Sequence, residues 1–181
     1  MLARLIPGKG VDILTDAYIH IRNNNMIPDL QLKIAGSKLK SDDQFLASIK
    51  EKLTIAGYGD DVEFKCNLTE EEKIDYLSSL TMFSTPAEYG ESFGLYVVEA
   101  AASGLPVVQP DSAAFPEILA KLKTGLLYET GSYISLAEKI KECYNNYGEY
   151  SQKADKARLT AMEHFTNKAM ATDVIGHLEA L

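Results

Sequence analysis

Residues 82–109 read MFSTPAEYGESFGLYVVEAAASGLPVVQ and contain the most informative pattern in the chain. A short apolar run at residues 82–85 predicts a strand that ends at Pro86. Residues 93–103 have the spacing of a helix, which Gly104 ends, and residues 106–109 form a second apolar run. A strand, a helix and another strand joined by short loops favour a right-handed crossover between two parallel strands.

The same alternation extends over the rest of the chain. Further strands are predicted at residues 2–6, 30–35, 62–66 and 125–128, and further helices at residues 11–22, 43–55, 70–80 and 116–121. From residue 133 onward the pattern is helical, with breaks near Gly148 and at Phe165. Thr69 and Glu72 have the spacing of a capping box. The pattern predicts an α/β fold, a doubly wound, Rossmann-like parallel six-stranded sheet with extra C-terminal helices.

The composition limits the classes of protein that need consideration. Of 181 residues, 46% are hydrophobic and 24% are charged, which is typical of a folded globular chain. The formal net charge is −8, so binding to the phosphate backbone of nucleic acid is not expected. The first 40 residues nevertheless hold six basic and three acidic side chains, a local excess of positive charge that suits a small anion.

The beginning of the chain and the cysteines bear on the compartment. The first ten residues lack the apolar stretch of a signal peptide, and no apolar run approaches the ~20 residues that span a bilayer. Cys66 and Cys143 lie far apart in the sequence, so neither a disulfide framework nor a cysteine metal site is predicted. The expectation is a cytoplasmic protein.

Loops that follow the predicted strands carry the candidate site, because ligands of doubly wound sheets bind beyond the carboxyl ends of the strands. Glu91 lies in the loop after residues 82–85, Gly94 at the start of the next helix, and Glu99 inside that helix. A helix start offers backbone N–H groups to an anion, and carboxylates accept hydrogen bonds from sugar hydroxyls. This layout fits a nucleotide sugar. The alternative is that Glu91 complements the helix dipole and Glu99 is solvated.

Two basic residues lie at the loop after the first predicted strand. Arg4 is placed at the carboxyl end of that strand, and Lys9 precedes Gly10 at the start of the following helix. Both side chains are long enough to reach a diphosphate bound at this edge of the sheet. Taken alone, a pair of solvated turn cations is an equally good interpretation.

Four motifs, in this order, resemble the C-terminal, donor-binding half of the group 1 retaining glycosyltransferases, which have the GT-B fold. They are RLIPGKG at residues 4–10, ESFGLYVVEA at residues 91–100, GLPVV at residues 104–108 and PEI at residues 116–118. The family includes bacterial sucrose-phosphate synthases, glycogen synthases and mannosyltransferases. The resemblance covers nearly the whole chain, from Arg4 to the final helices.

The resemblance implies a role for each matching residue. Arg4 and Lys9 would neutralise the nucleotide diphosphate, and together with Glu91, which contacts the donor sugar, they form the expected catalytic set. Glu99 would bind the ribose hydroxyls. The other donor-binding residues are expected to be Ser92, Phe93, Gly94, Leu95, Gly36 and Asn67, with Lys38 as a third cation if its loop folds inward. The transfer would retain the anomeric configuration and use neither a metal nor another cofactor, and the departing phosphate would take the proton of the acceptor.

The resemblance also implies a partner domain. In this fold the acceptor site belongs to an N-terminal domain, for which the chain has no room. We therefore expect residues 1–165 to form the nucleotide-sugar-binding domain and residues 166–181 a terminal helix that packs on the missing domain. By itself the chain is expected to bind donor weakly and to transfer nothing, and peripheral membrane contact would concern the full-length enzyme. The loops at 36–38 and 112–115 depart from the family pattern, which leaves the sugar of the donor open.

Two other classes stay open. A non-hydrolysing epimerase of similar architecture would need catalytic acids and a histidine near the cleft, and no histidine lies on a predicted strand-end loop. A non-catalytic module that uses this fold for protein contacts would leave the placement of Arg4, Lys9, Glu91 and Glu99 unexplained. A dinucleotide-binding protein is excluded because no G-x-G-x-x-G follows the first predicted strand.

Overall fold

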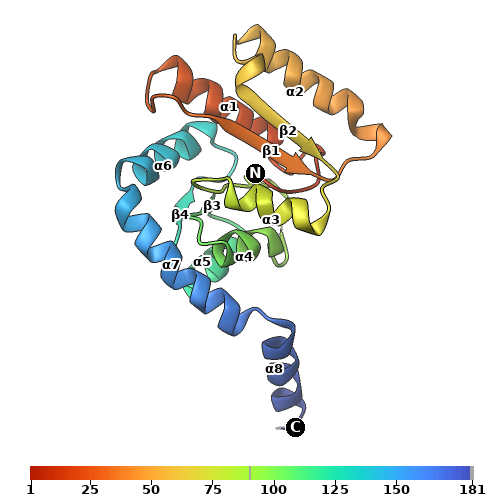
Figure 1. The fold of residues 1–181 in the computed structure, drawn as a ribbon, viewed down its shortest axis with the longest axis vertical. Coiled ribbons are helices and arrows are strands. Elements are labelled where there is room, and N and C mark those ends of the chain that lie inside the picture. The colour runs from red at the N-terminus through yellow and green to blue at the C-terminus, as the bar shows by residue number, and fades with distance from the viewer. Residues whose placement is uncertain (90, 180–181) are drawn as a thin grey trace.

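The computed structural model describes residues 1–89 and 91–179 (Figure 1). Within these residues the strands are β1 Leu32–Gly36, β2 Val62–Cys66, β3 Val108–Pro110 and β4 Leu126–Tyr128. The α-helices are α1 Val11–Asn23, α2 Asp43–Ile55, α3 Glu70–Ser78, α4 Leu95–Ala102, α5 Phe115–Leu122, α6 Tyr133–Asn145, α7 Tyr147–His164 and α8 Asn167–Glu179. Strands and helices alternate up to β4, as the sequence pattern predicts, except that no regular strand separates α3 from α4.

The sheet layer contains six extended segments in two groups of three. Residues 2–6 lie with β1 and β2, and residues 82–85 lie with β3 and β4. β1 pairs with β2 and β3 pairs with β4, both in parallel. The other two predicted strands, residues 2–6 and 82–85, make only single parallel bridges within the described residues, Leu2 with Ala35 and Phe83 with Val107. Pro7 and Pro86 end these two segments early, since proline cannot donate to a ladder. The α/β class and the parallel pairing are confirmed, but regular strands form at four of the six predicted places.

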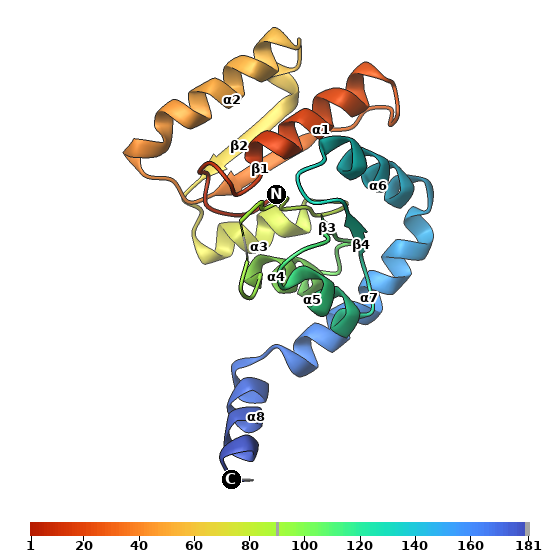
Figure 2. The ribbon, with the colours of Figure 1, turned by 180° about the vertical axis from the view of Figure 1, so that it is seen from behind.

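Both faces of this layer are covered by helices (Figures 1 and 2). One apolar core joins the strands to α1, α2 and α6, and a second joins them to α3, α4, α5 and α7. Neighbouring strand residues enter opposite cores: Ile34 and Val108 lie in the first, and Ala35 and Val107 in the second. Because successive side chains of a strand point to opposite faces, this division establishes the doubly wound arrangement.

The starts of three helices position the loops of the site. Thr69 and Glu72 form the predicted capping box: the Glu72 carboxylate accepts from the Thr69 N–H at 2.8 Å and the Thr69 hydroxyl from the Glu72 N–H at 3.2 Å. Gly10 precedes α1 with φ 83°, and Gly94 precedes α4 with φ 66°. A residue in the left-handed region cannot continue a right-handed helix, so α4 begins at Leu95, two residues later than predicted.

The C-terminal part is helical, with breaks at residue 146 and at residues 165–166. α7 packs on α4 and α5, whereas α8 contacts α7 and extends away from the strands in both views (Figures 1 and 2). None of the helices in the described part of the chain combines the length and apolarity needed to cross a membrane. The end of the predicted terminal helix, residues 180–181, lies outside the described residues.

Candidate functional site

The loop at residues 7–10 and the loop at residues 86–89 pack directly on each other. The Glu88 N–H donates to the Gly8 carbonyl at 3.0 Å. A Cβ atom on Gly10 would lie 2.1 Å from the Pro86 carbonyl oxygen, a distance that only glycine permits. Two loops from distant parts of the sequence are thereby joined at the carboxyl edge of the sheet, where the fold predicts a ligand site.

This packing places Lys9 against Glu91. The Lys9 Nζ donates to Glu91 Oε2 at 3.0 Å, with side-chain exposures of 31% and 18%. Glu91 also accepts from the Tyr96 hydroxyl at 3.1 Å and, weakly, from the Gly94 N–H at 3.4 Å. Burial acts to raise the pKa of the Glu91 carboxyl, but these three donors outweigh it and hold that pKa below its usual value. Glu91 is therefore an ionised, fixed carboxylate at neutral pH.

The start of α4 lies beside this ion pair. Gly94 is buried, and a Cβ there would approach Phe115 and Ile118 to 3.3 and 3.2 Å. Ser92, Phe93 and Leu95 are exposed, with 53% and 57% of Phe93 and Leu95 accessible. The Gly94 N–H points at the Glu91 carboxylate. The backbone N–H groups that lack a partner inside the helix therefore begin with the first residues of α4. These predicted donor-binding residues share one rim of the site.

Glu99 is held by a residue that the sequence reasoning missed. The Lys73 Nζ donates to Glu99 Oε1 at 3.1 Å and contacts Glu70 Oε2 at 2.8 Å. The hydrogen bonds that Lys73 donates to these carboxylates, first of all to Glu70, raise the pKa of its ammonium despite partial burial. Lys73 lies one turn into α3, and its only sequence signal is its spacing of four residues from the capping Thr69. The side chains of Lys73 and Glu99 thus connect α3 to α4.

The loops after β1 and β2 form a third part of the same edge. The Asn67 N–H donates to the Gly36 carbonyl at 2.9 Å, and Asn67 Oδ1 accepts from the Lys38 N–H at 2.9 Å. A Cβ on Gly36 would lie 1.5 Å from the Ala3 carbonyl oxygen, so glycine is required there for backbone packing. The Lys38 ammonium pairs with Asp43 on α2, so it does not serve as the inward-facing third cation.

Arg4 stands apart from these contacts. Its side chain is exposed, and within the described residues it makes no ion pair. The pKa of the Asp42 carboxyl is lowered, chiefly because Asp42 accepts a hydrogen bond from the Leu39 N–H. The positive charge of Arg4 adds to this lowering. The structure therefore brings Lys9 and Glu91 together. The contact of Arg4 with a diphosphate stays a prediction.

Tyr96 is the second residue that sequence reasoning missed. Its phenol donates to Glu91 from the first turn of α4, and burial raises the pKa of that phenol, so the hydroxyl stays protonated as a donor. Its spacing of five residues from Glu91 gives no helical signal, because the chain turns at Gly94 between them. Lys9 and Tyr96 both donate to Oε2 of this carboxylate.

The arrangement favours binding a polar, anionic ligand. Lys9, the N-terminal turn of α4 and the loop amides supply positive potential, and Glu91 and Glu99 supply hydroxyl acceptors. The described residues contain no group of three His, Cys, Asp or Glu side chains that would hold a metal ion. Whether the chemistry needs a metal stays a prediction.

Comparison with known proteins identifies the family to which this chain belongs. The family model described as "Glycosyl transferases group 1" matches residues 1–160. A phosphatidyl-myo-inositol mannosyltransferase from Mycobacterium leprae is 31% identical over 134 residues, which cover 74% of this chain and 33% of the relative. A lipopolysaccharide core mannosyltransferase, LpsB, from Rhizobium meliloti is 34% identical over 128 residues, or 70% of this chain and 34% of the relative. The chain spans about a third of the length of these relatives.

Solved structures agree on the fold. HepE from Anabaena in complex with UDP superimposes with a TM-score of 0.84 at 21% identity, over 99% of this chain and 48% of the other. Sucrose-phosphate synthase from Thermosynechococcus elongatus gives 0.83 at 23% identity, with 99% and 44% covered. The C-terminal domain of a group 1 glycosyl transferase (LpcC) from Francisella tularensis gives 0.78 at 21% identity and is covered over 85% of its length. The likeness establishes the architecture of a C-terminal GT-B half.

Proposed function

Because the chain belongs to the group 1 glycosyl transferases, we propose that it is the donor-binding half of a retaining enzyme. This enzyme moves a hexosyl group from a nucleoside-diphosphate sugar to an acceptor. The observation that carries the proposal is the joining of Lys9 and Glu91 by two packed loops, next to the N-terminal turn of α4. A diphosphate bound there contacts the Lys9 ammonium and the helix N–H groups, and the attached sugar contacts the fixed Glu91 carboxylate.

The roles of the side chains follow from their chemistry. Lys9 and the start of α4 stabilise the negative charge that develops on the leaving diphosphate, which is preorganised electrostatic catalysis. Glu91 accepts hydrogen bonds from hydroxyls of the donor sugar, and Arg4 adds charge at the same edge. The bond between the anomeric carbon and the phosphate oxygen breaks as the acceptor oxygen attacks from the same face, and the departing phosphate takes the proton of the acceptor.

Glu99 is proposed to hold the ribose. Lys73 donates to Oε1 of this carboxylate, and Oε2 accepts no hydrogen bond from the described residues, so a hydroxyl of the ribose can donate to it. Gly36 and Asn67 border the base side of the site. Some mannosyltransferase relatives are named as GDP-mannose-dependent, and the Anabaena neighbour holds UDP, so guanosine and uridine diphosphates are both donors to test.

The acceptor site is proposed to lie on another domain, against which α8 packs. The apolar side chains of α8 are exposed: Met170, Val174, Ile175 and Leu178 are 62%, 54%, 55% and 65% accessible. Such a row on one helix is typical of an interface, because isolated exposed apolar residues are common but clusters are not. The domain carried by residues 1–165 thus holds donor, and residues 166–179 reach the partner.

Calorimetric titration of the 181-residue chain with UDP, GDP and ADP tests the proposal. We expect one of the three to bind, and Glu99→Ala to abolish that binding while the matched control Glu138→Ala, an exposed residue of α6, leaves it unchanged. Absence of binding at millimolar ligand by the folded chain would instead favour a non-catalytic module.

A further inference from the structure

Two side chains from different elements donate to the same oxygen of Glu91. The Lys9 ammonium lies 3.0 Å from Oε2, and the Tyr96 hydroxyl lies 3.1 Å from it. A carboxylate oxygen has about two lone-pair sites, so these two donors occupy Oε2. Among the described residues, Oε1 has one long contact, 3.4 Å, with the Gly94 N–H. Because the Glu91 side chain is not fully buried, Oε1 is the oxygen left to accept a hydrogen bond from a ligand.

Tyr96 can hold the carboxylate because its own ring is held by packing. The ring centroid lies 6.4 Å from that of Phe83 and 6.3 Å from that of Phe115, which come from two other parts of the same core. Gly94, with φ 66°, turns the chain between Glu91 and Tyr96, so the phenol in the first turn of α4 reaches back to the carboxylate. A packed aromatic ring has few alternative rotamers, and the hydroxyl is therefore a fixed donor.

The two donors to Oε2 respond differently to a bound diphosphate. Lys9 carries the charge that binds the diphosphate, so its ammonium is shared between the phosphate oxygens and Glu91. The Tyr96 hydroxyl is neutral, since burial and the nearby Glu91 carboxylate raise the pKa of this phenol and keep it protonated. A neutral donor is attracted less strongly by the diphosphate than an ammonium is. The hydrogen bond from Tyr96 therefore stays with Glu91 when Lys9 turns toward the ligand.

We propose that Tyr96 is a positioning residue, which keeps the Glu91 carboxylate in place while Lys9 binds the diphosphate and so presents Oε1 to a hydroxyl of the donor sugar. This role rests on the proposed function and deepens it, because it separates two parts of the ligand. The diphosphate contacts Lys9, whereas the sugar contacts an oxygen whose position depends on Tyr96. Loss of the phenol hydroxyl then weakens binding of the sugar and does not affect binding of a nucleoside diphosphate that lacks one.

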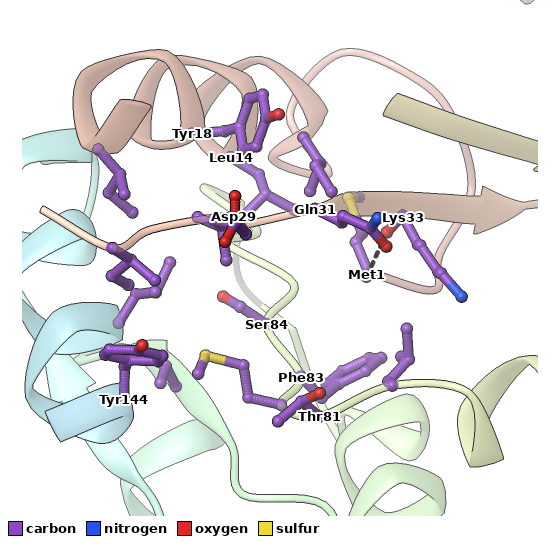
Figure 3. A pocket seen from close by; sticks show the side chains of 18 of the residues that line it. Met1, Leu14, Tyr18, Asp29, Gln31, Lys33, Thr81, Phe83, Ser84 and Tyr144 are labelled. Atoms are coloured by element: carbon purple, nitrogen blue, oxygen red, sulfur yellow. Dashed lines mark hydrogen bonds between the residues drawn. The ribbon is translucent and has the colours of Figure 1, made fainter. Parts of the chain in front are cut away.

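Two other buried hydroxyls serve as controls, because neither has a hydrogen-bond partner in the described residues. Tyr128 on β4 is 2% exposed, and its phenol is near enough to contribute to the raised pKa of Tyr96. Ser84 is 8% exposed, and its oxygen is directed into a cavity of about 310 Å³ that borders the start of β1 (Figure 3). Glu91 is not among the residues that line this cavity.

Calorimetry with ligands that do or do not carry a sugar tests the proposal. UDP-glucose, GDP-mannose and ADP-glucose are measured against UDP, GDP and ADP, on the wild-type chain and on Tyr96→Phe, which keeps the packed ring. For the pair that binds, we expect Tyr96→Phe to raise the Kd of the sugar nucleotide about five- to ten-fold, the range of one ordinary hydrogen bond. The Kd of the plain nucleoside diphosphate should stay the same, and Tyr128→Phe and Ser84→Ala should change neither value.

The titration of the Glu91 side chain gives a second measurement that needs no ligand. The groups that face this carboxylate are the Lys9 ammonium, the Tyr96 phenol and the Gly94 N–H, and each lowers its pKa. We expect the pKa of Glu91, followed by NMR of isotope-labelled glutamate in the free chain, to be higher in Tyr96→Phe than in the wild type. It should be unchanged in Tyr128→Phe.

The outcomes separate this role of Tyr96 from the proposed function. Equal weakening of the sugar nucleotide and the nucleoside diphosphate in Tyr96→Phe, or no weakening of either, would overturn the positioning role and leave the proposed function standing. An unchanged pKa of Glu91 in Tyr96→Phe would overturn it as well. Absence of binding of every probe to the folded wild-type chain would contradict the proposed function and, with it, the role toward the sugar.

Discussion

Lys9 is the residue on which the proposed chemistry depends most. It is the cation that the packing of residues 7–10 on residues 86–89 brings to Glu91. In a full-length enzyme we expect Lys9→Ala to lower kcat by about 10²–10³-fold, the effect of removing one preorganised donor, or about 2.7–4 kcal/mol of barrier. Lys156→Ala, an exposed lysine on α7, serves as the control in the same transfer assay. Near-normal turnover of Lys9→Ala would refute the assigned role.

Lys73 acts on the ligand through Glu99. Removing its ammonium leaves the Glu99 carboxylate without its only cation among the described contacts, so the orientation of Oε2 is lost. We expect Lys73→Met to weaken nucleoside-diphosphate binding about 3- to 10-fold, or about 0.7–1.4 kcal/mol, the range of one ordinary hydrogen bond. Glu70→Gln removes the other partner of Lys73 and is expected to leave the Kd unchanged. Calorimetry on the three proteins decides the point, and a Kd unaffected by Lys73→Met would contradict it.

The sequence predicted which loops and which helix carry the candidate site residues, but not the hydrogen-bond and ion-pair partners of their side chains. Motif order placed Lys9, Glu91 and Glu99 on loops and a helix that meet at one sheet edge. The ion pair of Lys73, the hydrogen bond of Tyr96 and the pairing of Lys38 with Asp43 depend on how far each side chain reaches between elements. Such contacts have no spacing rule along the chain, so pattern reasoning could not find them.

Among the elements, the two packed loops hold the site together. Gly10 and Gly57 have the same φ of 83°, but a Cβ on Gly57 meets nothing within 4 Å, whereas on Gly10 it meets Pro86. We expect Gly57→Ala to cost about 1–2 kcal/mol of unfolding free energy from backbone strain alone. Gly10→Ala should cost about 1–3 kcal/mol more from the clash, and it should also weaken donor binding.

Denaturant unfolding of both variants measures the difference, and titration with the preferred nucleoside diphosphate checks binding. Equal loss of unfolding free energy in Gly10→Ala and Gly57→Ala would show that residues 86–89 do not pack closely enough on Gly10 to exclude a Cβ atom. The sequence predicted glycines at both turns but not which of them faces another loop, since that is set by the tertiary packing of residues 86–89.

Helix and strand limits were predicted well where local chemistry decides them. The capping box at Thr69 and the strand at 62–66 are confirmed to the residue. The start of α4 was wrong by two residues because Gly94 adopts a left-handed conformation, φ 66°, which a right-handed helix cannot include. The segments at 2–6 and 82–85 fall short of full strands, and each is followed directly by a proline, Pro7 or Pro86, that cannot donate to a ladder.

At the scale of the whole molecule, the buried Met1 amine makes the stability of the 181-residue chain depend on pH. Its pKa is about 5 when folded and about 8 when unfolded, so between these values the unfolded chain holds more protons. The free energy of unfolding should therefore rise from pH 5 to pH 8, by at most about 1.4 kcal/mol per pH unit from this group. Acetylation of the amine should remove this contribution, and unfolding curves of both forms would show whether it does.

The proposed function requires a nucleoside diphosphate to bind across the loops at the carboxyl edge of the sheet. Amide chemical shifts of the labelled chain, recorded during titration with UDP, GDP and ADP, test it most directly. We expect one ligand to shift the amides of Lys9, Gly10 and residues 93–96 together with Asn67, and to leave those of Tyr18, Lys33 and Ser84 unmoved. Shifts confined to the cavity lined by Tyr18, Lys33 and Ser84, or no shifts with millimolar ligand, would contradict it.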